Sequence, residues 1–273
     1  MTVVDAGHGP PIVIVPGIQG RWEYIGPAVE AVATRCRVLT FPLAGERGSG
    51  RTFQPAEGFE NYCRQVDAVL DSRGLASAVV CGISFGGLVA LRFAATRPSR
   101  TRRLVLVSTP GPRWHLTRRH EIYARAPWLF GPFFLAETPH RLRSETVRAL
   151  PDSRDRRAFA RWQIRTLIRA PVSLSRMAAR ARLMGRPAEC AGRRDDCSRI
   201  AMPTLLINGE PGLDHVVSVD GSTQYAGLIF GAQCATLEHT GHLGCVTRPG
   251  AFAELLTAFA MQPHAEMSTP ECA

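Results

Sequence analysis

One serine stands between two glycines in the pattern Gly82-Ile83-Ser84-Phe85-Gly86, directly after an apolar run and directly before a helical pattern. In a strand–turn–helix of this kind the serine backbone is strained, so the positions two before and two after it must be small. The turn leaves the serine hydroxyl at the carboxyl end of the strand and above the positive end of a helix, where a developing anion is favoured. The pattern predicts a nucleophilic serine.

Two later loops carry the residue types that could activate this serine. A serine hydroxyl is a weak nucleophile at neutral pH, so it needs a base within hydrogen-bond reach and an acid that orients the base. Glu210 and Asp214 follow an apolar run that begins after residue 203. His239 and His242 follow the next apolar run. The acid loop precedes the histidine loop, and the expected order is Ser84, Asp214, His242.

The elements that must position these loops alternate in type before residue 110. Short apolar runs occur at 12–15, 38–41, 78–81 and 104–107, and helical patterns separate them at 22–33, 58–70 and 88–95. Strands this apolar are covered on both faces, so we expect an α/β fold with a mostly parallel sheet between two layers of helices. Apolar runs return at 204–207 and 235–237, and a closing helix follows over 251–259.

The middle of the chain has a different pattern. Arginine-rich helical segments are expected at about 115–126, 140–149, 155–169 and 173–185, with no strand between them. An apolar aromatic run from Trp128 to Leu135 lies among them, and we expect it to pack inside this insertion rather than to contact a ligand. The expected organisation is a first core part over 1–110, a helical insertion over 111–200, a second core part over 201–263 and a flexible tail over 264–273.

The serine pattern and both loops together resemble the α/β-hydrolase superfamily, over about residues 10–110 and 200–262. In that family the histidine lies in a small-residue turn before a proline and a final amphipathic helix. Gly241-His242-Leu243, with Pro249 behind it, fits this description. The resemblance favours His242 over His239. It also implies that the insertion after the strand ending near Val107 is a cap over the serine.

The position of the expected acid departs from the usual pattern of the family. Relatives usually place an aspartate three residues after the glycine that ends the strand, and Gly212 stands there in this chain. Asp214 lies two residues later, and a turn at Pro211-Gly212 would absorb the extra residues. Asp214 is therefore the expected acid, and Glu210 is the alternative.

A tetrahedral intermediate needs two N–H donors directed at its oxyanion. Phe85, directly after the serine, is expected to supply one. The resemblance assigns the other to Ile18, in the loop after the first apolar strand, where Pro16 replaces the histidine that is usual in relatives. The side-chain amide of Gln19 is an alternative donor.

Composition sets limits on partners. The chain has 273 residues, 45% hydrophobic and 21% charged, which is typical of a globular protein with a substantial core. Its formal charge is +10, and residues 111–200 hold 20 arginines against 8 acidic residues. No interleaving of aromatic and basic residues accompanies this charge, so we expect a solvated helical surface and no nucleic-acid partner.

The sequence also bears on localisation and cofactors. No segment approaches the roughly 18 consecutive apolar residues of a membrane span, and no basic region leads into an apolar one at the start. The eight cysteines are scattered without Cys-x-x-Cys pairs, which favours free thiols, although Cys190 and Cys197 could pair or bind a metal. We expect a cytoplasmic protein with no membrane span, no metal and no cofactor. The sequence does not indicate the oligomeric state.

These patterns predict a serine hydrolase that cleaves a small carboxylic ester or a related acyl compound through an acyl-enzyme. Thioesterase, lactonase, amidase, acyltransferase, haloperoxidase and carbon–carbon bond hydrolase reactions use the same triad on the same scaffold, and they stay open. Leu243 stands where carbon–carbon hydrolases often carry an aromatic residue. Two other classes are a slow-turnover ligand-binding protein and a binder of acidic surfaces. Neither explains why three catalytic loops match at once.

Overall fold

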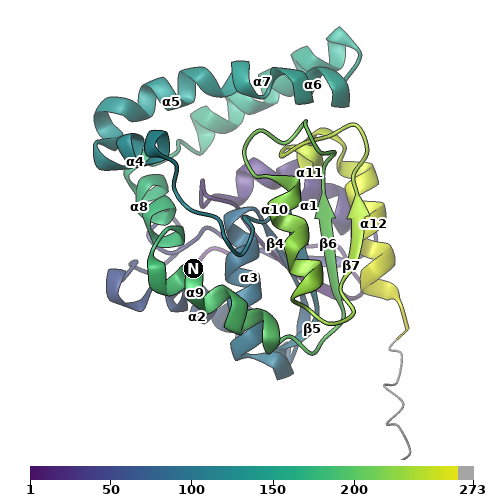
Figure 1. Cartoon of the computed structure of the whole chain (residues 1–273). Helices are drawn as coiled ribbons and strands as arrows, with labels where there is room; N and C mark the ends of the chain where they lie inside the picture. Colours follow the sequence, from purple (N-terminus) through teal and green to yellow (C-terminus); the bar gives the residue numbers. More distant parts are fainter. Residues whose placement is uncertain (264–273) are drawn as a thin grey trace, which may run out of the picture.

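A seven-stranded sheet forms the centre of the computed structural model, which describes residues 1–263 (Figure 1). The strands are β1 (Val4–Ala6), β2 (Pro11–Val15), β3 (Arg37–Thr40), β4 (Ala78–Ile83), β5 (Thr101–Val107), β6 (Thr204–Asn208) and β7 (Gln233–Thr236). Their order in the sheet is β1-β3-β2-β4-β5-β6-β7. Only the short β1, which the sequence did not reveal, runs antiparallel to its neighbour. The expected tail at 264–273 lies outside the described residues.

The apolar strands are buried on both faces, which explains why their sequences do not alternate with polar residues. In β2, Ile12 and Ile14 belong to one core cluster, while Val13 and Val15 belong to the other. All four side chains are fully buried. Because neighbouring side chains of a strand point to opposite faces, each face of the sheet must be covered by helices.

Two pairs of helices provide this cover. Helices α1 (Gly26–Ala33) and α12 (Pro249–Met261) contribute Val29, Val32, Phe252 and Leu256 to the cluster that contains Ile12. On the other face, α2 (Glu60–Asp71) and α3 (Phe85–Thr96) pack into the second cluster. The predicted α/β fold, with a mostly parallel sheet and helices on both faces, is confirmed.

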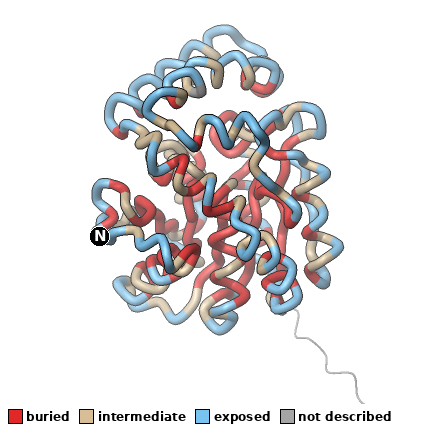
Figure 2. Tube along the Cα trace, turned by 60° about the vertical axis from the view of Figure 1, so that its left-hand side comes forward, coloured by how far each residue is buried: buried red, intermediate tan, exposed pale blue. Residues whose placement is uncertain are grey.

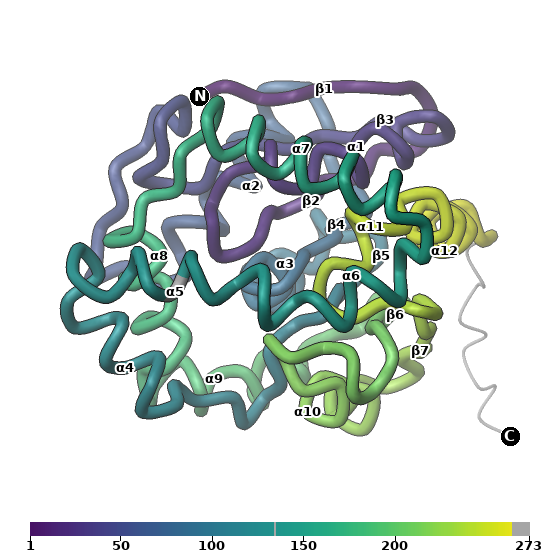
Figure 3. Tube along the Cα trace, turned by 90° about the horizontal axis from the view of Figure 1, so that it is seen from above, coloured from purple at the N-terminus to yellow at the C-terminus, as the bar shows by residue number. Residues whose placement is uncertain are grey.

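Six helices separate β5 from β6, and we call them the insertion. They are α4 (Arg118–Arg125), α5 (Pro127–Arg141), α6 (Arg143–Ala149), α7 (Ser153–Arg169), α8 (Leu174–Met184) and α9 (Pro187–Ser198). In Figure 1, α5, α6 and α7 lie across the top of the core, whereas α9 lies beside α3. Most of the upper layer is exposed, in contrast to the buried central strands (Figure 2). Seen from above, α5, α6 and α7 lie in front of the core (Figure 3).

Two details of the insertion differ from the expectation. The aromatic run is part of α5, and Trp128 and Phe133 are 78% and 61% exposed, so the prediction that they pack inside the insertion is wrong. The helix turns these side chains outward while Gly131, on another side, meets Leu174 of α8. Helix α9 was not predicted, because most of its residues are polar. In the structure it contacts the core through the buried Cys197 side chain.

Among residues 1–263, every helix is too short or too polar to cross a membrane.

Four short helical segments lie near the loops discussed below, and two more, η2 (Pro55–Glu57) and η3 (Pro98–Arg100), lie elsewhere in the core. The four near the loops are η1 (Trp22–Ile25), α10 (Val219–Thr223), η4 (Gln224–Gly227) and α11 (Gly244–Thr247).

Candidate active site

The turn between β4 and α3 places Ser84 in a strained backbone conformation, with φ 56° and ψ −118°. A Cβ atom at position 82 would lie 2.2 Å from the carbonyl oxygen of Gly86, and one at position 86 would lie 2.2 Å from the carbonyl oxygen of Val15. Only glycine fits at both positions. The N–H of Ser84 donates to the carbonyl of Val107 at 2.8 Å, which ties the turn to the end of β5. Strain of this kind persists only where its surroundings hold it in place.

Three side chains from distant loops meet at this turn. His242 Nε2 lies 3.1 Å from Ser84 Oγ, and His242 Nδ1 lies 3.1 Å from Asp214 Oδ2. The other oxygen of Asp214 accepts the N–H groups of Val216 and Val217 at 2.9 and 2.7 Å. The acid is therefore oriented by its own loop. The arrangement is a continuous hydrogen-bonded chain from carboxylate to imidazole to hydroxyl.

Asp214 and His242 stabilise each other's charged forms, the carboxylate and the imidazolium. Burial alone would raise the pKa of Asp214, but the nearby imidazole and the two backbone N–H donors outweigh burial and hold this pKa below its ordinary value. Burial alone would lower the pKa of His242, but the Asp214 carboxylate outweighs it and the pKa is raised. An imidazolium formed at this position is thus stabilised.

The acid and histidine loops touch through their backbones. A Cβ atom at position 241 would lie 2.4 Å from the carbonyl oxygen of Leu213, so Gly241 lets the two loops approach closely. Gly212 has a φ of +85°, in the left-handed region that favours glycine. This turn lies where the acid loop has its two extra residues, and it brings Asp214 to the histidine.

The alternative acid and the alternative histidine are paired with each other. Glu210 Oε1 accepts the N–H of His239 at 2.7 Å and lies 3.3 Å from His239 Nδ1. The His239 side chain is exposed. Both residues are engaged at the surface, away from the chain of contacts that reaches Ser84.

The loop after β2 lies directly beside the serine. A Cβ atom at Gly17 would be 3.6 Å from Ser84 Cβ and 3.3 Å from Gln19 Oε1. The next residue is Ile18, and Phe85 opens α3 on the other side of the serine. Both expected N–H donors therefore belong to segments that adjoin Ser84.

Two buried side chains of the insertion, Arg180 and Glu145, contact these loops, and the sequence did not single them out. Arg180 of α8 is almost fully buried, donating to the carbonyl of Ile18 at 3.0 Å and to Glu46 Oε1 at 2.7 Å. Glu145 of α6 accepts the N–H groups of Gly241 and Leu243. Among 20 arginines and 8 acidic residues in this region, no pattern marks which of them are buried.

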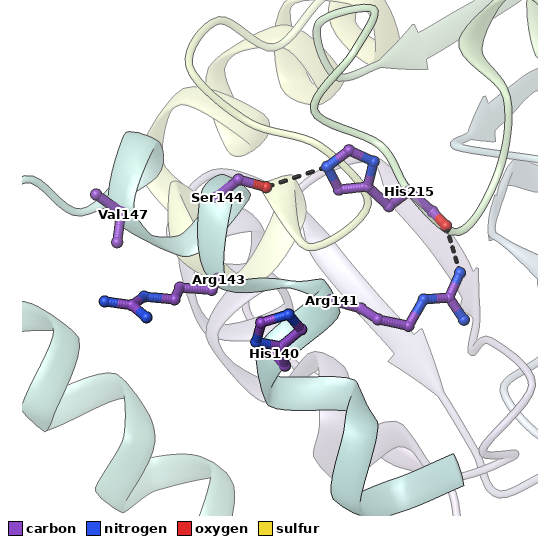
Figure 4. A pocket seen from close by; sticks show the side chains of 6 residues that line it. All are labelled: His140, Arg141, Arg143, Ser144, Val147 and His215. Atoms are coloured by element: carbon purple, nitrogen blue, oxygen red, sulfur yellow. Dashed lines mark hydrogen bonds between the residues drawn. The ribbon is translucent and has the colours of Figure 1, made fainter.

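An open cavity of about 790 Å³ lies where α5 meets α6 (Figure 4). Its lining comprises His140, Arg141, Arg143, Ser144, Val147 and His215. Ser144 Oγ lies 3.1 Å from His215 Nε2, and Arg141 donates to the carbonyl of His215 at 2.9 Å. These contacts fasten the insertion to the residue that follows Asp214.

A family model and several known proteins match the sequence of this chain. A family model for the alpha/beta hydrolase fold matches residues 10–249. A 2-hydroxymuconate semialdehyde hydrolase from Pseudomonas putida is 26% identical over 93% of this chain and 88% of its own length. A pimeloyl-(acyl-carrier protein) methyl ester esterase from Stenotrophomonas maltophilia is 28% identical over 89% of each chain. A protein from Azorhizobium caulinodans named as a carbamate hydrolase is 33% identical, but the match spans only 37% of this chain and 38% of that protein.

Solved structures agree in architecture. The enol-lactonase from Burkholderia xenovorans superposes with a TM-score of 0.74 and 21% identity over 96% of both chains. A thermophilic esterase from Thermogutta terrifontis has a TM-score of 0.72 and 20% identity, covering 94% of this chain and 92% of that one. At such identities the likeness shows the fold. Since the family model covers most of the sequence and the sheet carries the same architecture, the chain belongs to the α/β-hydrolase fold family.

Proposed function

We propose that the protein is a serine hydrolase that cleaves a small carboxylic ester or a related acyl compound through an acyl-enzyme. The observation that carries this proposal is the unbroken contact from Asp214 through His242 to Ser84, with 3.1 Å at each step. Nucleophile and base within hydrogen-bond reach, with the base oriented by a third group, are the arrangement that activates a hydroxyl. Family membership and relatives named as hydrolases support the reaction class.

In the proposed reaction the Ser84 hydroxyl attacks the acyl carbon while His242 Nε2 takes the hydroxyl proton. Asp214 holds the imidazole in the tautomer with hydrogen on Nδ1 and stabilises the imidazolium. The N–H groups of Ile18 and Phe85 bind the oxyanion, with the Gln19 amide as the alternative to Ile18. His242 then returns the proton to the leaving alcohol. Water, activated by the same imidazole, hydrolyses the acyl-enzyme and frees Ser84.

The proposal is tested with p-nitrophenyl acetate and a fluorophosphonate probe. Purified protein should hydrolyse the ester and become phosphonylated on one residue, and Ser84→Ala should abolish both signals while the protein stays folded. Full esterase activity in Ser84→Ala, or no labelling of the unaltered protein, would contradict the proposal.

Carbon–carbon bond hydrolysis is the second candidate, because the relative from Pseudomonas putida named for such a substrate aligns with 93% of the chain. Leu243 argues against it, since an aromatic residue often follows the histidine in those enzymes. The two candidates share Ser84, so only the pocket distinguishes their substrates. Comparing kcat/KM across esters, thioesters, lactones, amides and a 2-hydroxy-6-oxodienoate decides between them.

A further inference from the structure

Glu145 is a buried acidic residue that the proposed reaction does not use. It lies on α6, its residue is 0% exposed, and one carboxylate oxygen accepts two backbone N–H groups. The bond from Gly241 measures 3.0 Å, and Leu243 supplies the other donor. These two residues flank His242. A single acceptor oxygen therefore binds the N–H groups of the residues before and after the histidine.

We infer that Glu145 is a positioning residue for His242, through which the insertion holds the imidazole in line with Ser84. This inference rests on the proposed function. Backbone orientation on both sides of a residue determines where its Cα–Cβ bond points, and an imidazole must be placed within a fraction of an ångström to bridge hydroxyl and carboxylate. No other side chain has a described hydrogen bond to the N–H groups on both sides of His242.

The cost of burying Glu145 supports a role beyond packing. Burial raises the pKa of this carboxyl to about 7, although hydrogen bonds from the histidine loop and the charge of His242 act in the opposite direction. Its second oxygen is buried without a hydrogen-bond partner among the described residues. A buried, half-satisfied carboxylate destabilises a fold. Its placement is consistent with a site where geometry matters more than stability.

The same stretch of the insertion also reaches the acid loop. Arg141 and Ser144 contact His215, which follows Asp214 directly, as the dashed lines in Figure 4 show. Glu145 is the next residue in α6 after Ser144. Residues 141–145 thus contact both loops that supply partners to Ser84. A shift of α6 would therefore change the alignment of the proposed triad.

Three substitutions separate the position of the acceptor from its charge. Glu145→Gln keeps an acceptor oxygen at the same reach, Glu145→Asp withdraws it by one methylene, and Glu145→Ala removes it. We expect kcat for p-nitrophenyl acetate to fall about 10- to 100-fold in the Asp and Ala variants, with KM nearly unchanged. The rate at which the fluorophosphonate labels Ser84 should fall in parallel. The Gln variant should stay within about fivefold of the unaltered protein.

The pH profile of Glu145→Gln supplies a readout that a purely structural role would not move. Three titratable groups interact with the Glu145 carboxylate: His242, Asp214 and Cys245. The carboxylate is charged only above its pKa of about 7, and there its negative charge favours the imidazolium. Neutralising it should therefore move the acidic limb of kcat/KM slightly to lower pH. An acidic limb that moves to higher pH in Glu145→Gln would contradict the inference.

A matched control is Glu189→Ala, which removes another acidic contact between the insertion and the core. Glu189 pairs with Arg92 of α3, and among residues 1–263 neither has a described hydrogen bond or ion pair with the loops of Asp214 or His242. We expect unchanged kcat in this variant. Wild-type kcat and labelling rates in folded Glu145→Asp and Glu145→Ala would overturn the inference. So would an equal loss of kcat in Glu189→Ala.

A measurement without substrate separates this inference from the proposed function. The ring-nitrogen NMR signals of His242, assigned by their loss in His242→Ala, should move or broaden in Glu145→Asp and Glu145→Ala but persist in Glu145→Gln. If Ser84→Ala kept esterase activity, the proposed function would fail while this readout still decided the role of Glu145. Unchanged ring signals in all three Glu145 variants would overturn that role.

Discussion

The sheet core and the upper layer of the insertion, α5 to α7, differ in how far their apolar side chains are buried. Core side chains such as Leu206 and Phe93 are fully buried among apolar neighbours, whereas large apolar side chains of α5 and α7, including Trp128 and Ile168, face outward. Helices α8 and α9 of the insertion add Leu183, Met184 and Cys197 to the apolar core, but the insertion also meets the core through directional polar contacts. Tyr24, for example, donates to the carbonyl of Ala170 at 2.8 Å.

This difference separates stability from alignment. Apolar burial is non-directional, so it gives the core its stability without specifying the angle of any one side chain. Hydrogen bonds weaken steeply when bent, so buried polar contacts determine the course of a loop. Arg180 and Glu145 lie where the insertion meets the loops around Ser84. The site thus takes its rigidity from the core and part of its geometry from the insertion.

Removing the imidazole should have the largest effect. His242→Ala is expected to lower kcat/KM for ester hydrolysis by about 10⁴-fold or more, because Ser84 loses its base. The midpoint of urea unfolding should fall moderately, since buried Asp214 loses its imidazole partner, so folding has to be checked beside activity. Activity and unfolding are measured on the same preparation. Retained activity in a folded variant would refute the proposed base.

A matched pair of phenylalanines contrasts the two regions directly. Phe93→Ala in α3 should reduce the free energy of unfolding by about 3–5 kcal/mol, because it leaves a cavity in the core. Phe133→Ala in α5 should change it by less than about 0.5 kcal/mol, because the ring is exposed. Chemical denaturation measures both. Similar losses would show that the insertion depends on apolar burial as the core does.

A pair of arginines sharpens the contrast for polar contacts. Arg180 and Arg176 bind different oxygens of buried Glu46, but their side chains are 2% and 48% exposed. Arg180→Met should cost about 3 kcal/mol of unfolding free energy and lower kcat, because it leaves Glu46 under-compensated and releases the carbonyl of Ile18. Arg176→Met should cost less than about 1 kcal/mol. Equal losses in denaturant titrations would argue against a special role for the buried arginine.

The pH dependence of catalysis should follow His242. A general base must be neutral, and Asp214 raises the pKa of His242 above the ordinary histidine value of about 6.5. We expect kcat/KM to fall about tenfold per pH unit below that pKa, with a midpoint above pH 6.5. Steady-state rates in buffers of constant ionic strength measure it. A midpoint well below pH 6.5 would show that the imidazole is not paired with a carboxylate in the working enzyme.

Much of the core could be predicted because the signals are local. The runs at 12–15 and 104–107 are apolar over their whole length, which requires cover on both faces and hence a parallel sheet. The glycines around Ser84 follow from steric contact within one turn. Strand β1 has only three residues, too few to show the residue alternation of a strand. Helix α9 is mostly polar, so its sequence does not reveal an apolar face. The prediction that the aromatic run in α5 packs inside the insertion was wrong, because apolar residues need not face inward.

The amino-acid sequence by itself determined the alternation of strands and helices, the serine turn and the order of the three loops, because these depend on residue type and on neighbours a few positions away. Tertiary structure alone decided that Asp214 pairs with His242 while Glu210 pairs with His239. It also selected Glu145 and Arg180 from many charged residues of the insertion. The physical reason is that burial of a charge and its hydrogen-bond partner both depend on segments that lie about 100 residues or more away along the chain.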